Sequence, residues 1–281
     1  MSQVSQRDVD AIKTWLAKQS YLPNTFEDKV LRKFLFSCHC SLERTKKCIE
    51  EFCIRRANMP ELYSDRDPTA KKMKIAFADS TVTTHMAGDD EILIHRLLDT
   101  ENYDFYDCLK SFGILADNWI NYEYENGSLP DKHIIIMDMK VYTLKLVAKS
   151  NIFYYQKFLL YTLESMPVRL KEVHLVNCPP FYDYLFNLVK PVLPEYLCEM
   201  INFHPDHMGL HKFIDKKYLP KEYDGEAESM AHQMSRWVNE VGEKRTSYLD
   251  NNYWKADLSK KPKNGTVDNS MSGSFRTLAI D

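Results

Sequence analysis

The first part of the chain has apolar residues at positions that share one face of a helix. Three such stripes consist of Val9, Ile12 and Leu16, then Val30, Leu31, Phe34 and Leu35, and then Thr45, Cys48, Ile49 and Phe52. Ser41 is a suitable N-cap for the third helix, and Pro60 ends it. Residues 1–75 are therefore predicted to form an all-α N-terminal lobe, which must pack on another element to bury its stripes.

From about residue 90 the pattern changes to short apolar runs separated by helical stretches. The runs at 92–94, 133–137, 173–177 and 200–204 predict strands. Helices are predicted at 106–124, 151–165 and 181–189. Strand, helix and strand of these lengths require a right-handed crossover between parallel strands. We therefore predict an α/β domain with a mixed, largely parallel sheet over residues 76–250.

The last residues have a different composition. Residues 251–281 are rich in Lys, Asn, Ser and Gly and contain few apolar residues. Such a segment cannot bury enough apolar surface to offset the entropy of ordering it. The sequence predicts a flexible C-terminal tail there.

The charge of the chain is informative mainly through its uneven distribution along the sequence. The chain has 37 Lys+Arg and 40 Asp+Glu, a net charge of −3, which does not favour a dedicated nucleic-acid binder. Residues 1–75 carry a net +5 (15 basic, 10 acidic) and residues 244–281 a net +3 (7 basic, 4 acidic), which leaves about −11 for the middle. This asymmetry fits either attraction to anionic membrane surfaces or ordinary solvated helices.

The cellular compartment is suggested by the lack of the usual sequence signals for secretion and membrane insertion. The N-terminus, MSQVSQRDVD, has no apolar core of a signal peptide, and no apolar run approaches the roughly 20 residues that span a bilayer. The 7 cysteines are scattered rather than set in a disulfide framework. We expect a monomeric cytoplasmic protein that associates with membranes only transiently.

Candidate catalytic and metal-binding motifs are weak. The chain has 8 glycines and shows neither a phosphate-binding loop nor a G-x-S-x-G elbow. His204, His207 and His211 could supply metal ligands, but Pro205 and Gly209 interrupt any helix that would align them. Cys38-His39-Cys40 is too closely spaced to chelate one zinc ion well. We expect no metal, no cofactor and no catalytic residues.

An apolar excess is the most informative feature of the α/β part. His133, Ile135 and Met137 share one face of a strand. The next helix carries on one face Tyr154, Phe158, Tyr161, Thr162 and Ser165. Extra apolar surface with a few hydroxyl groups is typical of a lipid cavity. A thick solid core fits these residues equally well.

Several segments together resemble the CRAL-TRIO lipid-binding family, in the branch of alpha-tocopherol transfer protein and cellular retinaldehyde-binding protein. They are Leu31-Arg32-Lys33-Phe34-Leu35, Met137-Asp138, Ser165-Met166-Pro167, Arg169 to Asn177, Val189-Lys190-Pro191-Val192-Leu193 and Tyr218 to Glu226. They occur in the family's order and spacing over residues 7–250. The resemblance implies a helical lobe on an α/β lobe whose helices form a deep apolar pocket under a movable lid helix.

Carried over by position, the resemblance also assigns residues to the pocket. The lid falls on residues 181–201, with Phe181, Leu185, Phe186 and Val189 facing the ligand. The implied ligand-binding wall consists of His133, Ile135, Met137, Phe158, Tyr161, Thr162, Met166, Val168 and Leu170. His133 and Tyr161 make this wall bulkier and more polar than a tocopherol pocket, which implies a different cargo.

The phosphoinositide site of this branch is only half matched. Arg169 and Lys171 retain basic residues, whereas Phe36, Tyr196 and Met200 occupy the other positions. Headgroup binding is therefore expected to be weak.

The resemblance implies an intracellular carrier of a small hydrophobic lipid, such as a retinoid or a tocopherol, between membranes. One alternative is a phosphoinositide-binding or peripheral-membrane adaptor with a residual pocket. Another is a lipid-modifying enzyme that uses His133 or Tyr161 as acid or base.

Overall fold

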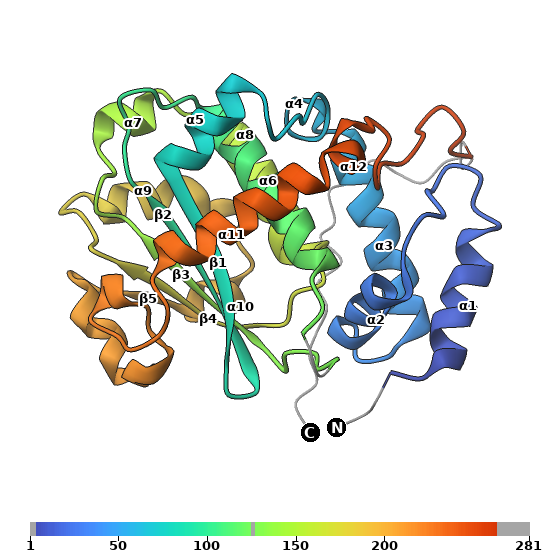
Figure 1. Ribbon diagram of the computed structural model, residues 1–281, viewed down its shortest axis with the longest axis horizontal. Coiled ribbons are helices and arrows are strands. Elements are labelled where there is room, and N and C mark those ends of the chain that lie inside the picture. The colour runs from blue at the N-terminus through green and yellow to red at the C-terminus, as the bar shows by residue number, and fades with distance from the viewer. Residues whose placement is uncertain (1–3, 125–126, 263–281) are drawn as a thin grey trace.

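The computed structural model describes residues 4–124 and 127–262, and a sheet of five strands runs through its α/β part (Figure 1). The strands lie side by side in chain order. β1 and β2 are antiparallel, and β2 to β5 are parallel. Their bounds are Ser80–Ala87 for β1, Asp90–Leu97 for β2, His133–Asp138 for β3, Leu170–Val176 for β4 and Ile201–Phe203 for β5. The predicted α/β class with a largely parallel sheet is confirmed.

The N-terminal helices occupy one end of the molecule (Figure 1). They are α1 Gln6–Leu16, α2 Asp28–Ser37, α3 Leu42–Ala57 and the short α4 Pro60–Tyr63. The residues of all three predicted stripes are buried, and the Ser41 hydroxyl accepts a hydrogen bond from the backbone N–H of Arg44 at the start of α3. The helical interpretation of this region is therefore confirmed.

Helical crossovers connect the parallel strands. α6 (Phe105–Asn121) joins β2 to β3, and α7 (Leu144–Ala148) with α8 (Ile152–Glu164) joins β3 to β4. β4 is joined to β5 through α9 (Tyr182–Val189), η1 (Lys190–Val192) and α10 (Glu195–Glu199). The strand–helix–strand arrangement predicted from residues 133–177 is present, with β3 and β4 parallel.

Several elements were not predicted, among them a helix and a strand whose residues are mixed in polarity. α5 (Lys71–Asp79) precedes β1, whose sequence STVTTHMA contains three threonines. These are Thr81, Thr83 and Thr84, and all are buried. Gly88 lies in the short turn between β1 and β2. Its φ of +69° is a backbone conformation that residues with L side chains rarely adopt. A search for apolar periodicity alone does not find such a strand.

One face of the sheet packs tightly against the C-terminal third of the chain. This face carries Ile92, Ile94, Ile134, Ile136 and Val176, all buried. They meet residues of three short 3-10 helices, η2 (His207–Lys212), η3 (Lys216–Tyr218) and η4 (Lys221–Tyr223), and of α11 (Met230–Glu243), which crosses over β1 (Figure 1). α12 (Arg245–Leu249) follows. This side of the sheet is a solid core.

The predicted flexible tail differs from the structure at its beginning. Trp254 is 1% exposed, and its ring stacks on Phe26 at 5.5 Å. The backbone N–H of Ala256 donates to the carbonyl of Cys53 and that of Asp257 to the carbonyl of Tyr21. Residues 253–257 are thus packed on the N-terminal helices because one large aromatic ring finds a site there. Residues 263–281 of the predicted tail lie outside the described residues.

A buried cluster of charges ties together α3, α6 and the segment that follows α4. The carboxylate of Asp117 accepts two hydrogen bonds from Arg56 (2.7 and 2.6 Å) and one from Arg66 (2.5 Å). All three side chains are at most 1% exposed. Burial alone would raise the pKa of Asp117, but the two guanidinium groups outweigh burial and hold that pKa below its usual range.

Replacing Asp117 by Asn should destabilise the fold strongly. Two buried guanidinium groups would lose their counter-charge, which typically costs about 3–5 kcal/mol. Asp107→Asn on the same helix is the control, because Asp107 pairs with the half-exposed Lys72 at 3.4 Å and such a pair contributes about 1 kcal/mol or less. Urea unfolding would compare the two, and equal losses would contradict the assignment.

Candidate functional site

The second face of the sheet is apolar but only half covered. We call it the open face, and it consists of Leu93 and His95 in β2, Ile135 and Met137 in β3, Val173 and Leu175 in β4, and Phe203 in β5. All seven are half-buried, whereas the residues between them on β2 and β3 are buried. Central parallel strands are normally buried on both faces. Apolar side chains that keep accessible surface there indicate incomplete packing above the sheet.

His95 shows that the open face lies deep in the protein. Burial lowers the pKa of this imidazole to about 4, although part of the side chain remains accessible. Tyr155 of α8 behaves in the same way, since burial raises the pKa of its phenol to about 12 while the residue is half-buried. Both groups therefore lie in poorly hydrated surroundings although part of each residue is accessible.

α8 turns a different side to the sheet than the sequence predicted. Its buried stripe is Tyr154, Phe158 and Tyr161, and it belongs to the core shared with the N-terminal helices. The ring of Tyr161 lies 5.6 Å from that of Phe52, and its hydroxyl accepts a hydrogen bond from Arg56 at 3.2 Å. Tyr161 and Phe158, which the resemblance assigned to the ligand wall, thus lie buried in this core.

The adjacent side of α8 is the accessible one. Tyr155, Leu159 and Leu163 follow at the i, i+4, i+8 spacing of one helix face and are half-buried. Thr162 is also half-buried, and its hydroxyl donates to the carbonyl of Phe158. Since this helix is apolar around most of its circumference, its apolar pattern does not distinguish the two sides.

Other expected wall residues are divided between core and open face. His133 is buried, accepts the backbone N–H of Arg169 on Nδ1 at 3.0 Å, and places Nε2 3.4 Å from Glu91. Met166 is buried in the helical core, and Val168 packs against that core. Leu170 is half-buried and pairs with His133 in the register of β3 and β4. The structure thus brings Ile135 and Met137 together on the open face and places His133 and Met166 elsewhere.

The expected lid segment covers the outer strand. α9 contains no buried residue, and Phe181, Leu185, Phe186 and Val189 are all half-buried. The rings of Tyr182 and Phe186 lie 5.0 and 5.2 Å from that of Phe203 on the open face. Gln156 of α8 donates to the carbonyl of Leu188 at 2.8 Å. This helix therefore rests on the edge of the open face through few interior contacts.

The sequence of this region matches a known family. Residues 92–225, which include every residue of the open face and the whole of α9, match the family model described as the CRAL/TRIO domain. These residues are thus similar to the CRAL/TRIO domain. Residues 2–73 match a second model, the UBA domain of Pinta-like proteins.

Named relatives are also similar to this chain. The chain is 27% identical over 229 residues to a mouse protein named alpha-tocopherol transfer protein-like and 26% identical to its human counterpart. Those alignments cover 79% of this chain but 65% of each relative, so the match is less than two thirds of their length. Clavesin-1 of rat is 35% identical over 63 residues, 22% of this chain and 18% of clavesin-1. The crystal structure of Sfh5 has the same fold, with a TM-score of 0.52 at 12% identity over 86% of this chain and 96% of Sfh5.

The two cations expected near a headgroup already have acidic partners. Arg169 lies 3.0 Å from Asp131 and also stacks over the ring of Phe36, and Lys171 lies 2.8 Å from Asp90. The three histidines considered for a metal have separate partners: His204 contacts His174, His207 contacts Asp224, and His211 contacts a backbone carbonyl. Within residues 4–124 and 127–262, no three His, Cys, Asp or Glu side chains form a metal-binding group. No helix described there is long and apolar enough to cross a membrane.

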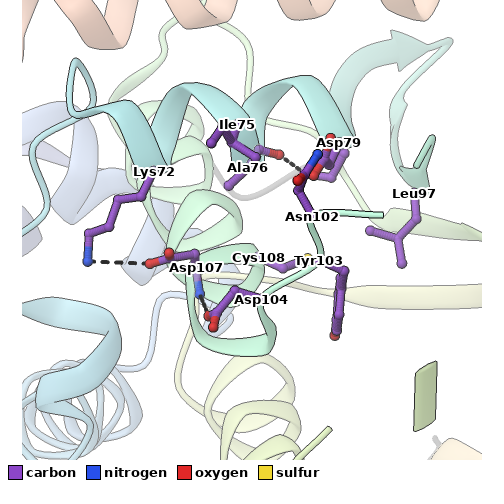
Figure 2. A pocket seen from close by; sticks show the side chains of 11 residues that line it. Lys72, Ile75, Ala76, Asp79, Leu97, Asn102, Tyr103, Asp104, Asp107 and Cys108 are labelled. Carbon is purple, nitrogen blue, oxygen red and sulfur yellow. Dashed lines mark hydrogen bonds and ion pairs between the residues drawn. The ribbon is translucent and has the colours of Figure 1, made fainter. Parts of the chain in front are cut away.

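Two hollows lie away from the open face. Figure 2 shows the first, which lies between α5 and the start of α6. Lys72 pairs with Asp107 there, and Cys108 and Tyr103 also line the hollow. Its volume of about 80 Å³ is far below the several hundred Å³ of a typical ligand pocket. The second, the α5–α11 groove, measures about 540 Å³. It is lined by Lys74, Phe77, Ala78, Thr81, Arg96, Leu98, Glu222, Met230, Ala231, Met234, Ser235, Val238 and Asn239.

Consecutive residues of α8 should respond differently to truncation. Phe158→Ala removes a ring from a packed core and should cost about 3–5 kcal/mol of unfolding free energy. Leu159→Ala enlarges space that already exists, so we expect about 1 kcal/mol or less, because no new void forms. Chemical denaturation would measure both, and an equal large loss would indicate a solid core on both sides of α8.

Proposed function

We propose that the protein carries one small hydrophobic lipid on its open face and transfers it between membranes without changing it chemically. The observation that supports this most directly is the apolar open face at the centre of the sheet, deep enough to shift the pKa of His95 yet still accessible. In this proposal residues 1–75 support a lipid-binding domain of residues 76–250. The protein acts as a cytoplasmic monomer that touches membranes transiently.

Burial of the cargo drives binding. Apolar area removed from water contributes about 25 cal/mol per Å², so a lipid that buries several hundred Å² gains on the order of 10 kcal/mol before losses. The open face offers branched and aromatic side chains from four strands, and α8 adds Leu159 and Leu163. Binding therefore depends on shape and apolar area more than on single polar contacts.

The polar groups of the face favour a neutral lipid. Because the pKa of His95 is about 4, its imidazole is uncharged at neutral pH and offers no ion pair to a carboxylate. Its nitrogens and the phenol of Tyr155 remain available to orient a hydroxyl or a carbonyl group. A retinoid or a tocopherol has this chemistry.

Release requires α9 to move. A helix without buried residues has little interior packing to lose, so opening costs less than for a core helix. A bilayer can stabilise the open state by accepting the apolar side of α9, with Phe181, Leu185, Phe186 and Val189. Transfer then depends on contact with a membrane, since opening in water exposes these side chains.

Filling the open face should abolish cargo binding while the fold persists. We expect Leu159→Trp to retain a melting temperature near that of the unchanged protein and to lose at least tenfold in lipid recovered by mass spectrometry of organic extracts. Ala231→Trp is the control, since Ala231 is exposed and lines the α5–α11 groove instead. Loss of cargo in Ala231→Trp alone would place the lipid in that groove, and chemically altered cargo would favour an enzyme.

Phosphoinositide binding should be weak and limited by the acidic partners of Arg169 and Lys171. Arg169→Ala with Lys171→Ala should reduce flotation with phosphoinositide-containing vesicles. Asp90→Asn with Asp131→Asn should increase it, by about thirtyfold if each freed cation contributes about 1 kcal/mol near the membrane. Breaking these half-buried surface pairs should cost the fold about 1 kcal/mol each. Tight flotation that neither double variant changes would show that another surface binds the headgroup and would favour the adaptor function.

A further inference from the structure

The segment that forms α7 and α8 has an unusual charge. No acidic residue occurs between Asp138 and Glu164, whereas Lys140, Lys145, Lys149 and Lys157 fall there. All four lysines are exposed, and no carboxylate among the described residues lies within ion-pairing distance of them. This part of the surface is therefore locally cationic in a chain whose middle is acidic overall.

Two large apolar side chains project from the same segment. Phe153, in the first turn of α8, is 75% exposed, and Leu144, at the start of α7, is 53% exposed. Single exposed apolar residues are common. Here, however, Leu144 is adjacent to Lys145, and Phe153 precedes Lys157 by one helical turn. Apolar tips and lysines thus alternate on one corner.

This corner is held firmly by residues that point inward. Leu146 and Tyr154 are buried, and the Tyr154 hydroxyl donates to Glu61. The amide of Asn151 donates to the Tyr106 hydroxyl at 3.1 Å, and the hydroxyl of Ser150 donates to the carbonyl of Leu146. Leu144 and Phe153 are consequently presented by an ordered backbone, so docking costs little ordering entropy.

We propose that the corner between α7 and α8 docks on anionic lipid bilayers, with Leu144 and Phe153 entering the interface and the lysines contacting lipid phosphates. Lysine is depleted at protein–protein interfaces, whereas lysines beside Phe and Leu are typical of surfaces that lie on anionic membranes. The proposal rests on the proposed lipid transfer for its purpose, since it gives the carrier a fixed contact with donor and acceptor membranes.

The position of the corner suits that purpose. α7 lies at the same end of the molecule as α9, opposite α1 to α3 (Figure 1). Gln156 in α8 is hydrogen-bonded to Leu188 in α9, and Tyr184 of α9 is 56% exposed. The helix that carries Phe153 is thus in direct contact with the lid helix.

The test uses the full chain and vesicles of phosphatidylcholine with or without about one third phosphatidylserine. We expect flotation with the anionic vesicles only, declining with added salt because exposed charges are screened. Leu144→Ser with Phe153→Ser, and separately Lys145→Gln with Lys149→Gln and Lys157→Gln, should each reduce partitioning at least tenfold. Phe153→Trp should show a blue-shifted emission that brominated lipids quench.

The matched control removes three exposed charges from the opposite end, by Lys18→Gln, Arg44→Gln and Lys47→Gln. It should change partitioning less than threefold. No flotation of the unchanged protein, an equal loss in this control, or a Phe153→Trp emission that stays unshifted on bound vesicles would each overturn the docking surface. Measuring co-purified lipid separates the two proposals. If the docking variants still hold cargo, the carrier function stands whatever their membrane binding. If the unchanged protein docks on vesicles but holds no cargo, only the carrier function is rejected.

Discussion

The ion cluster of Arg56, Asp117 and Arg66 fixes the rest of the arrangement. A buried carboxylate that serves two guanidinium groups leaves one net positive charge in the interior, which would be costly without compensation. Aromatic rings provide that compensation. Tyr63 lies 4.1 Å from the Arg56 guanidinium, and Tyr248 lies 5.6 Å from that of Arg66. The cluster thereby links α3, α6, α8 and the C-terminal segment in a single geometry.

The rotation of α8 follows from this cluster. Because the Tyr161 hydroxyl accepts a hydrogen bond from Arg56, the stripe of Tyr154, Phe158 and Tyr161 faces the N-terminal helices. Tyr155, Leu159 and Leu163 lie on the adjacent side of the helix and remain half-buried. The N-terminal lobe therefore has a structural part in shaping the open face, although it contributes no residue to it.

Much of the fold was predictable because each of its signals is local. Apolar spacing and caps located α1 to α3, and apolar runs located β3, β4 and β5. The site was only partly predictable. Ile135 and Met137 were assigned correctly to one face of a strand, because side chains alternate between only two faces along a strand. Tyr161 was misplaced because α8 is apolar on nearly every side, and only the position of Arg56, 105 residues away in the sequence, selects the face. β1 and the packed Trp254 depend equally on long-range partners.

Opening and docking are linked if the bilayer contacts both α9 and the α7–α8 corner. A membrane shifts the lid equilibrium only by the difference between its affinities for the open and the closed protein. Asn151 and Tyr154 anchor the corner to α6 and α4 and not to α9, so the proposed lid opening does not break these contacts. In the proposed mechanism the corner holds the protein at the membrane surface. The apolar side of α9 is covered by the protein when the lid is closed and by lipid when it is open, so it provides the difference in membrane affinity between the two states. Residence at the membrane and release of cargo are therefore governed by separate sets of residues within one short stretch of the chain.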